Sequence, residues 1–393
     1  MSEAGAVMNV PKLRFPEFSG AWKEVRLANL GRFKSGVGFP EQEQGGTSGT
    51  PFFKVSDMNL EGNEHVMSRA NHYVTQDQIH RLRFSVINDR SIIFAKVGAA
   101  IFLERKRQAE RFLFDNNMMA FIPGKEITFE FCVQKFSAIR LSRFAQVGAL
   151  PSYNSSDIGI IKVAFPTLPE QQNIADFLGA VDARVELLKR RREALVAYKK
   201  AMMQRLFART LRFTKPDGSP FPDWQQKQLG EIATIRKGQQ LNRDTLSDEC
   251  EFPVINGGIN ASGYTDEWNT EANVITLSEG GNSCGYVDWQ DKRFWLGGHC
   301  YAILPKSSKC YDRFLLQALK LLQPAIMRLR VGSGLPNIQK GDLTKLPLDI
   351  PHYEEQHKIA QFLAAFDNKI AALSTQIAVT QRFKQGLLQQ MFV

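Results

Sequence analysis

Basic side chains concentrated in a few short segments are the residues of this chain with the clearest chemical potential. Arginine and lysine bind phosphate oxygens, and arginine, asparagine and glutamine also reach base edges in a DNA groove. In the first half of the chain the candidates for such contacts are Lys34, Lys54, Lys96, Arg105, Lys106, Arg107 and Arg111. In the second half, in segments that look comparable, they are Arg236, Lys237, Arg243, Asn256, Lys292 and Arg293. These residue types support recognition of an anion rather than covalent chemistry.

A second set of polar residues follows the last glycine of each half, Gly148 and Gly334. It comprises Ser152, Tyr153, Asn154, Asn337, Gln339 and Lys340. Hydroxyl and amide groups read base edges when the loop that carries them enters a groove. We therefore predict DNA contacts from this set as well. For both sets the alternative is an ordinary solvated loop.

Motifs for catalysis are not found in the sequence. It has no G-x-x-x-x-G-K-[ST] phosphate loop, no H-E-x-x-H metal helix and no G-x-S-x-G nucleophile turn. It also lacks the Asn/Asp-Pro-Pro-aromatic segment expected of an amino-methyltransferase. The segment 280–285 is glycine-rich without a lysine, which favours a turn, and the adjacent His299 and Cys300 would point to opposite faces of a strand. We expect no catalytic residue, no metal site and no cofactor bound by this chain.

Composition narrows the class of partner. The net charge of +10 favours an anionic partner, nucleic acid before membrane, although a basic chain can also be basic only for solubility. Five cysteines without a CxxC pair argue against a disulfide framework. The most apolar stretch, residues 91–103, is interrupted by Lys96 and is too short to span a bilayer. We expect a cytoplasmic protein without a membrane partner.

The elements that must position these residues occur twice. Trp22 and Leu27 match Trp224 and Leu229 at a separation of 202 residues. A middle block matches at 182, with Ile93 opposite Ile275 and Gly98 opposite Gly280, and the closing block matches at 185. The second copy is therefore expected to lack 20 residues between Pro253 and Ile275, where the two surfaces should differ most. Two copies at fixed separations predict a duplicated architecture.

Each copy reads as a mixed domain followed by a long helix. Short apolar runs bounded by glycine and proline predict buried strands at residues 91–95, 119–122, 274–277 and 301–304. We predict an α+β chain with two tandem domains of mixed α/β structure and twisted sheets, related by a pseudo-two-fold axis. The predicted domains are residues 10–165 and 211–350, and the predicted helices lie within residues 166–210 and 351–393.

The two helices carry apolar residues at alternating steps of four and three, which is the period of a coiled-coil seam. The seam positions are Ile174, Leu178, Val181, Val185, Leu188, Ile359, Leu363, Phe366, Ile370 and Leu373. We predict that the helices pair antiparallel and act as a rigid spacer; the alternative is that each packs only on its own domain. Arg192, Lys199 and Lys384 take seam positions, so part of each helix is expected to stay exposed or to meet another protein. The basic run 189–192 is either a solvated face or a surface for DNA or an acidic partner.

With the repeat and the helices in view, nearly the whole chain resembles the specificity subunit of type I restriction–modification enzymes. The openings that carry the resemblance are Leu13-Arg14-Phe15-Pro16 with Trp22, and Phe221-Pro222-Asp223-Trp224 with Lys237-Gly238. The closings are Pro166, Glu170-Gln171, Ile174-Ala175 and Phe177-Leu178, repeated as Pro351, Glu355-Gln356, Ile359-Ala360 and Phe362-Leu363.

The resemblance implies a function for each part. Each half would hold a target-recognition domain that reads one part of a bipartite double-stranded DNA sequence, and the helices would set the spacing and dock two modification subunits. Those subunits would use S-adenosylmethionine to methylate adenine, and restriction subunits would use ATP and Mg²⁺. Two other hypotheses remain open from the sequence, namely a DNA-binding scaffold or regulator of the same fold and an independent methyltransferase or nuclease.

Overall fold

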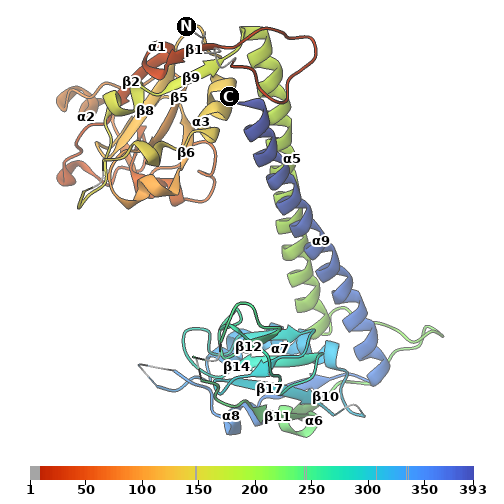
Figure 1. Cartoon of the computed structure of the whole chain (residues 1–393). Coiled ribbons are helices and arrows are strands. Elements are labelled where there is room, and N and C mark those ends of the chain that lie inside the picture. Colours follow the sequence, from red (N-terminus) through yellow and green to blue (C-terminus); the bar gives the residue numbers. More distant parts are fainter. Residues whose placement is uncertain are drawn as a thin grey trace. The chain divides into compact units, whose positions relative to one another are not determined.

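Two repeats of one strand order build the chain (Figure 1). The structure, a computed structural model, describes residues 9–146, 148–242, 244, 246–306, 308–332, 334 and 336–393, so Arg243 lies outside the described residues. The chain divides into a first unit, Met1–Leu188 with Gln376–Val393, and a second unit, Lys189–Thr375. Each unit contains one mixed domain and segments of both long helices, α5 (Leu168–Phe207) and α9 (Tyr353–Met391).

The first domain contains a four-stranded antiparallel sheet, a three-stranded sheet and a two-stranded ribbon. Their orders are β2 (Gly31–Ser35), β8 (Met118–Pro123), β5 (Ser91–Ala95), β6 (Lys106–Ala109); β4 (His72–Val74), β3 (Thr50–Phe53), β7 (Leu113–Phe114); and β1 (Lys23–Arg26), β9 (Lys162–Phe165). Its short helices are α1 (Leu27–Leu30), η1 (Glu41–Glu43), η2 (Val55–Asn59), α2 (Gln76–Arg81), η3 (Ala99–Leu103), α3 (Phe129–Ala138), η4 (Leu141–Phe144) and α4 (Ser155–Gly159).

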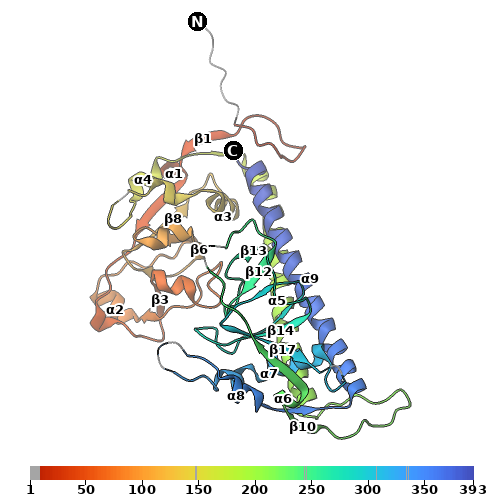
Figure 2. The ribbon, with the colours of Figure 1, turned by 60° about the horizontal axis from the view of Figure 1, so that its bottom comes forward.

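The second domain repeats these three sheets in the same order. They are β11 (Ala233–Lys237), β17 (Cys300–Pro305), β14 (Val274–Ser278), β15 (Val287–Gln290); β13 (Tyr264–Thr265), β12 (Phe252–Ile255), β16 (Trp295–Leu296); and β10 (Gln225–Gln228), β18 (Pro347–Ile350). Its helices are α6 (Leu229–Ile232), α7 (Asp312–Met327) and α8 (Lys340–Thr344). Figure 2 shows the sheets of both domains from a second direction. The α+β fold class predicted from the sequence is confirmed.

The strand register corrects one part of the repeat alignment. Ile93 pairs with Ala120 in the first domain, whereas Thr276 pairs with Ala302, the match of Ala120, in the second. Ile275 is therefore equivalent to Ile92, and the predicted match to Ile93 is wrong by one residue. A slip of one residue exchanges the two faces of a strand, and a repeat read from apolar runs cannot detect it when both faces are buried.

The same correction moves the glycine turn. The Gly98 amide donates to the Pro151 carbonyl over 2.8 Å, and the Gly281 amide donates to the Pro336 carbonyl over 3.0 Å. Gly98 is thus equivalent to Gly281 and not to Gly280. The missing residues of the second copy fall mainly between β12 and β14, where the first copy has η2, β4 and α2 between β3 and β5.

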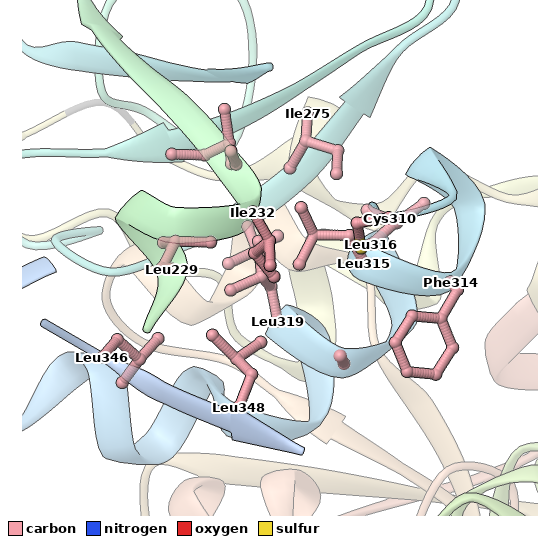
Figure 3. Close-up of a cluster of buried hydrophobic side chains, with 14 of the residues drawn as sticks. Leu229, Ile232, Ile275, Cys310, Phe314, Leu315, Leu316, Leu319, Leu346 and Leu348 are labelled. Atoms are coloured by element: carbon pink, nitrogen blue, oxygen red, sulfur yellow. The ribbon is translucent and has the colours of Figure 1, made fainter. Parts of the chain in front are cut away.

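Buried apolar residues explain why these segments form strands in both domains. All five residues of β5 and all five of β14 are buried, so each of these strands is covered on both faces. In the second domain one cluster joins the sheet to α7 (Figure 3). Ile275 from the sheet and Leu315 and Leu319 from α7 belong to this cluster, together with Leu229 and Leu348. This core fixes the sheet edges from which the loops emerge.

Within each unit the two long helices run antiparallel. In the first unit Leu178 of α5 shares a core cluster with Leu387 and Met391, near the end of α9. In the second unit Leu206, near the end of α5, shares a cluster with Ile359 and Leu363 from the start of α9. The alternative of each helix packing only on its own domain is therefore excluded. Of the predicted seam, those buried are Ile174, Leu178, Val185, Leu188, Ile359, Leu363 and Leu373, and those half-buried are Val181, Phe366 and Ile370.

Two lysines expected to leave the seam exposed are instead paired across it. The Lys384 ammonium lies 2.6 Å from a carboxylate oxygen of Asp182, and the Lys199 ammonium lies 2.6 Å from one of Asp367. The two lysine side chains are only 18% and 13% exposed. The long methylene stem packs in the seam while the charge finds an acid on the other helix.

Candidate nucleic-acid interface

In the first domain the ends of two neighbouring elements gather several predicted residues. Lys34 is exposed on β2, and Lys96 follows the end of β5 with its ammonium 3.3 Å from the Ser35 hydroxyl. Val97 bridges antiparallel to Ser152. The sheet thus places Lys34, Lys96 and Ser152 at one edge, although Lys34 and Ser152 are more than a hundred residues apart in the chain. This edge offers two ammonium groups and a hydroxyl to an anion.

The next two predicted residues hold the loop in place. Tyr153 is buried, its hydroxyl donates to the Ala95 carbonyl over 2.5 Å, and burial raises its pKa. Asn154 caps α4 and accepts from the amides of Ser156 and Asp157. Both side chains are engaged inside the domain, which positions the neighbouring Ser152.

The predicted basic segment of β6 divides into residues with different roles. The Lys106 side chain is only 8% exposed, and its ammonium donates to Glu104 and to the Ile139 carbonyl. Burial lowers its pKa, and Glu104 opposes that shift. Arg107 is half-buried, and its pKa is lowered, mainly by burial and to a smaller extent by the positive charge of Arg105. Lys106 therefore stabilises the fold, whereas Arg105 and Arg107 reach the surface only in part.

A cleft of about 330 Å³ lies beside this strand, within the first unit. Lys106 and Arg107 line it together with the acids Glu130, Asp182 and Glu186. Mixed charge of this kind is a poor match for the phosphate backbone, which repels carboxylates. The outer edge near Lys34 and Lys96 is the better candidate for a DNA contact.

The other two predicted residues of the first domain belong to its smaller sheet. Lys54 follows β3 and its ammonium donates to the Gln44 side chain over 2.6 Å. Arg111 is exposed in the turn before β7, with a backbone φ of 49°. A non-glycine residue with positive φ is uncommon, so the turn holds Arg111 in a defined direction.

In the second domain the matching edge carries a different charge pattern. Arg236, the match of Lys34, donates to the Thr270 hydroxyl over 2.6 Å. Lys237 pairs with Glu279 over 2.7 Å, and the Tyr301 hydroxyl lies 2.9 Å from the same carboxylate oxygen. Glu279 stands at the position of Lys96, so an acid replaces a base there. Sequence reasoning missed Glu279 because it searched for basic and neutral polar residues and not for acids.

The loop of the second polar set also recurs. Asn337 bridges Gly280 and Val331, as Ser152 bridges Val97 and Gln146 in the first domain. The Gln339 side chain donates to the Asn337 side chain over 2.9 Å, and Lys340 is exposed at the start of α8. The structure therefore presents one pair of loops twice, with different side chains.

The remaining predicted residues of the second domain lie in turns. The Asn256 side chain accepts from the His299 amide over 3.0 Å, and Lys292 is exposed. Arg293 pairs with Glu271 over 2.9 Å and its guanidinium lies 4.5 Å from the Trp268 ring centre. Because Phe294 and Phe112 form equivalent bridges, Arg293 matches Arg111.

Comparison with known proteins decides the family. The family model described as type I restriction modification DNA specificity domain matches residues 20–197 and again residues 222–381.

The chain belongs to this family.

Individual relatives agree with the family match. A putative type I specificity subunit of Mycoplasma pneumoniae is 33% identical over 172 residues, which cover 43% of this chain and 46% of that protein. One from Mycoplasma genitalium is 31% identical over 172 residues, covering 43% and 45%. The chain thus spans just under half the length of these curated relatives.

A solved structure shares the fold over the full length. The crystal structure of the type I restriction–modification S subunit from Mycoplasma genitalium superposes with a TM-score of 0.64 at 19% identity, covering 98% of this chain and 99% of that one. At this identity the likeness concerns the fold.

Among the described residues, no three His, Cys, Asp or Glu side chains gather as a metal site would require. Burial raises the pKa of Cys300 and Cys310 to about 12, so neither thiol is a ready nucleophile. No helix in the described part of the chain is long and apolar enough to cross a membrane.

Proposed function

We propose that this chain is the sequence-specific DNA-binding subunit of a type I restriction–modification complex and performs no catalysis of its own. Each domain reads one part of a bipartite target. The helices α5 and α9 set the spacing between the two parts and dock two modification subunits. The complex then directs adenine methylation or restriction.

The observation that carries the proposal is the repeated pair of loops. The bridge of Val97 with Ser152 and the bridge of Gly280 with Asn337 place equivalent loops at equivalent sheet edges. The frame is the same, but Lys96 in one copy becomes Glu279 in the other. Lys96 can donate to guanine acceptors, whereas Glu279 is buried and held by Lys237 and Tyr301, so the two edges offer different groups and suit two different DNA words.

Partners and cofactors follow from membership of the family. We propose that this chain binds no cofactor and that the modification subunits hold S-adenosylmethionine. Restriction subunits would supply the sites for ATP and Mg²⁺, and the complex would act in the cytoplasm. Methylation of an adenine requires the base to leave the stack, and a subunit that grips the duplex on both sides of that base would help to hold the distortion.

The test is to map methylated adenines. The full chain is co-expressed with its modification subunit in a host that lacks adenine methylation, and the genome is sequenced for the modified base. We expect one bipartite motif with a fixed gap, absent when either protein is expressed alone. Replacing residues 10–165 by the corresponding domain of a relative should change one half of the motif only.

Two outcomes would overturn the proposal. Methylation by the purified chain alone would make it an enzyme. A chain that binds DNA selectively but never directs methylation with its modification subunit would be a regulator of the same fold.

A further inference from the structure

Two large apolar side chains stand out on the surface of the first domain. Phe102 is 60% exposed and Leu103 is 61% exposed, next to each other at the end of η3. We call this pair the apolar tip. Scattered apolar residues on a surface are ordinary, but two adjacent ones at the end of a loop expose a continuous patch.

The backbone around the apolar tip is held firmly. Ile101, the preceding residue, is buried at 3% exposure and anchors the loop in the core. Glu104, the following residue, has a left-handed φ of 50°, and its carboxylate accepts from the amides of Leu141 and Ser142. Lys106 donates to the same carboxylate. A strained residue kept in place by this many contacts indicates a position with a function.

The contacts of Glu104 also bring a second segment, which is apolar and basic, next to η3. Glu104 binds the first amides of η4, and η3 packs beside η4. Phe144 at the end of η4 is 38% exposed, and Arg143 beside it is exposed. Leu150, 63% exposed, lies against the Gly98 turn at the start of η3. The elements packed beside the apolar tip therefore expose further apolar side chains, so the tip is not an isolated pair.

The second domain has no counterpart of this feature among its described residues. Ile101 is matched by the buried Cys284, and Lys106 is matched by Val287 through the strand register. Only two residues, Gly285 and Tyr286, lie between those positions, whereas four lie between Ile101 and Lys106. The apolar tip is thus an insertion confined to one repeat, and the shared frame does not require it.

We propose that the apolar tip is a wedge that enters the DNA duplex and separates two stacked base pairs beside the half-site read by the first domain. This rests on the proposed function and names one device by which the domain grips its target. Residues 96–107 and 140–154 hold six basic residues and a single acid, Glu104. The Lys106 side chain is buried and engages the Glu104 carboxylate, and the other five basic residues are half-buried or exposed. Cations around an exposed phenylalanine and leucine suit a base step between two phosphate backbones.

The experiment uses the full chain and a pool of random duplexes. Selection with wild-type protein gives the preferred sequence, and 2-aminopurine is then placed at each step of it in turn. A rise in fluorescence on binding marks the step that loses stacking. We expect one such step near the first half-site, and we expect Phe102→Ala with Leu103→Ala to abolish the rise and to weaken binding about tenfold.

The controls separate the possible failures. Leu168→Ala removes an apolar side chain that is 47% exposed on α5 and should leave both readouts unchanged. If wild-type protein selects no sequence, the proposed function fails before the wedge is tested. If it selects one but no step unstacks, or the double variant keeps its fluorescence change, the wedge is wrong. Normal DNA binding with lost affinity for the modification subunit would assign the patch to that protein instead.

Discussion

The two domains share a frame but differ at their edges. In both domains the four-stranded sheet has two central strands between two outer strands. One of the central strands, β5 or β14, is buried on both faces. The differences gather in loops, as in residues 54–90 against residues 256–273. Buried positions tolerate few side chains, whereas surface loops accept many. A duplicated domain can therefore keep one fold and recognise two different ligands.

Charge shows this difference at matched positions. Ser35 and Lys96 in the first domain correspond to Lys237 and Glu279 in the second. At the edge strand Arg107 corresponds to Asp288 by register. The same geometry thus carries a lysine beside a serine in one copy and a lysine paired with a buried glutamate in the other.

The largest expected effect on stability concerns a buried glutamate that binds an arginine and a tryptophan in the same way in both units. We call this set of contacts the lock. Glu170 accepts from Arg14 over 2.7 Å and from the Trp22 indole over 3.2 Å, and Glu355 binds Arg212 and Trp224 in the same manner. Glu170→Ala and Glu355→Ala leave a buried indole without its acceptor and remove the carboxylate partner of a half-buried arginine, which keeps only backbone carbonyls as acceptors. Each should lower the free energy of unfolding of its own unit by about 3–5 kcal/mol, measured by hydrogen exchange under denaturant.

The matched control is Glu126→Ala, which removes an exposed partner of Lys23 and should cost less than about 1 kcal/mol. If loss of Glu170 and loss of Glu355 differed severalfold, the two frames would not be equivalent. A cost below about 1 kcal/mol for both would show that the lock contributes little to either.

A smaller effect on stability is expected at a buried position where the two domains differ. Lys135 on α3 is buried at 4% exposure, and burial lowers its pKa from 10.5 to about 8. Its counterpart in α7 is Ala318. Because the folded pKa lies below the unfolded one, the protonated lysine costs folding energy below pH 8. Lys135→Met should therefore stabilise the first unit by about 1–3 kcal/mol at pH 7.

The pH dependence checks the cause. Between pH 8 and 10.5 the unfolded chain binds more protons at this site, so wild-type stability rises with pH and the advantage of Lys135→Met shrinks. The exposed Lys125→Met is the control and should show no such trend. A constant advantage across that range would mean that packing and not charge explains the difference.

The smallest effect concerns the matched arginines of the two edges. Arg111 is exposed, whereas Arg293 is paired with Glu271. If Arg111 contacts a phosphate, Arg111→Ala should lower the slope of log affinity against log salt by about 0.9. Arg293→Ala should change it less, and Glu271→Gln should raise it. Equal slopes for all three variants in a salt titration would place both arginines outside the interface.

Much of the frame could be predicted from the sequence, because buried residues repeat by type. The contact between Trp22 and Glu170 recurs between Trp224 and Glu355. Because the same contact requires the same side chains, both pairs could be matched from the sequence. The register at Ile93 could not be read, because both faces of β5 are apolar. The ion pairs of Lys199 with Asp367 and of Lys384 with Asp182 were missed, because each acid lies on the other long helix. Phe102 and Leu103 were hidden in an apolar stretch whose first part is a buried strand.

Each unit completes its core with residues from the other repeat. Leu387 and Met391 lie in the second copy by sequence but close the cluster around Trp22, and Met203 and Leu206 of the first copy do the same around Trp224. A truncated chain that stops between the repeats would leave the Trp22 cluster uncovered. Such a fragment should be stable only when another polypeptide supplies the missing helix, so each half of the chain depends on the other for a complete core.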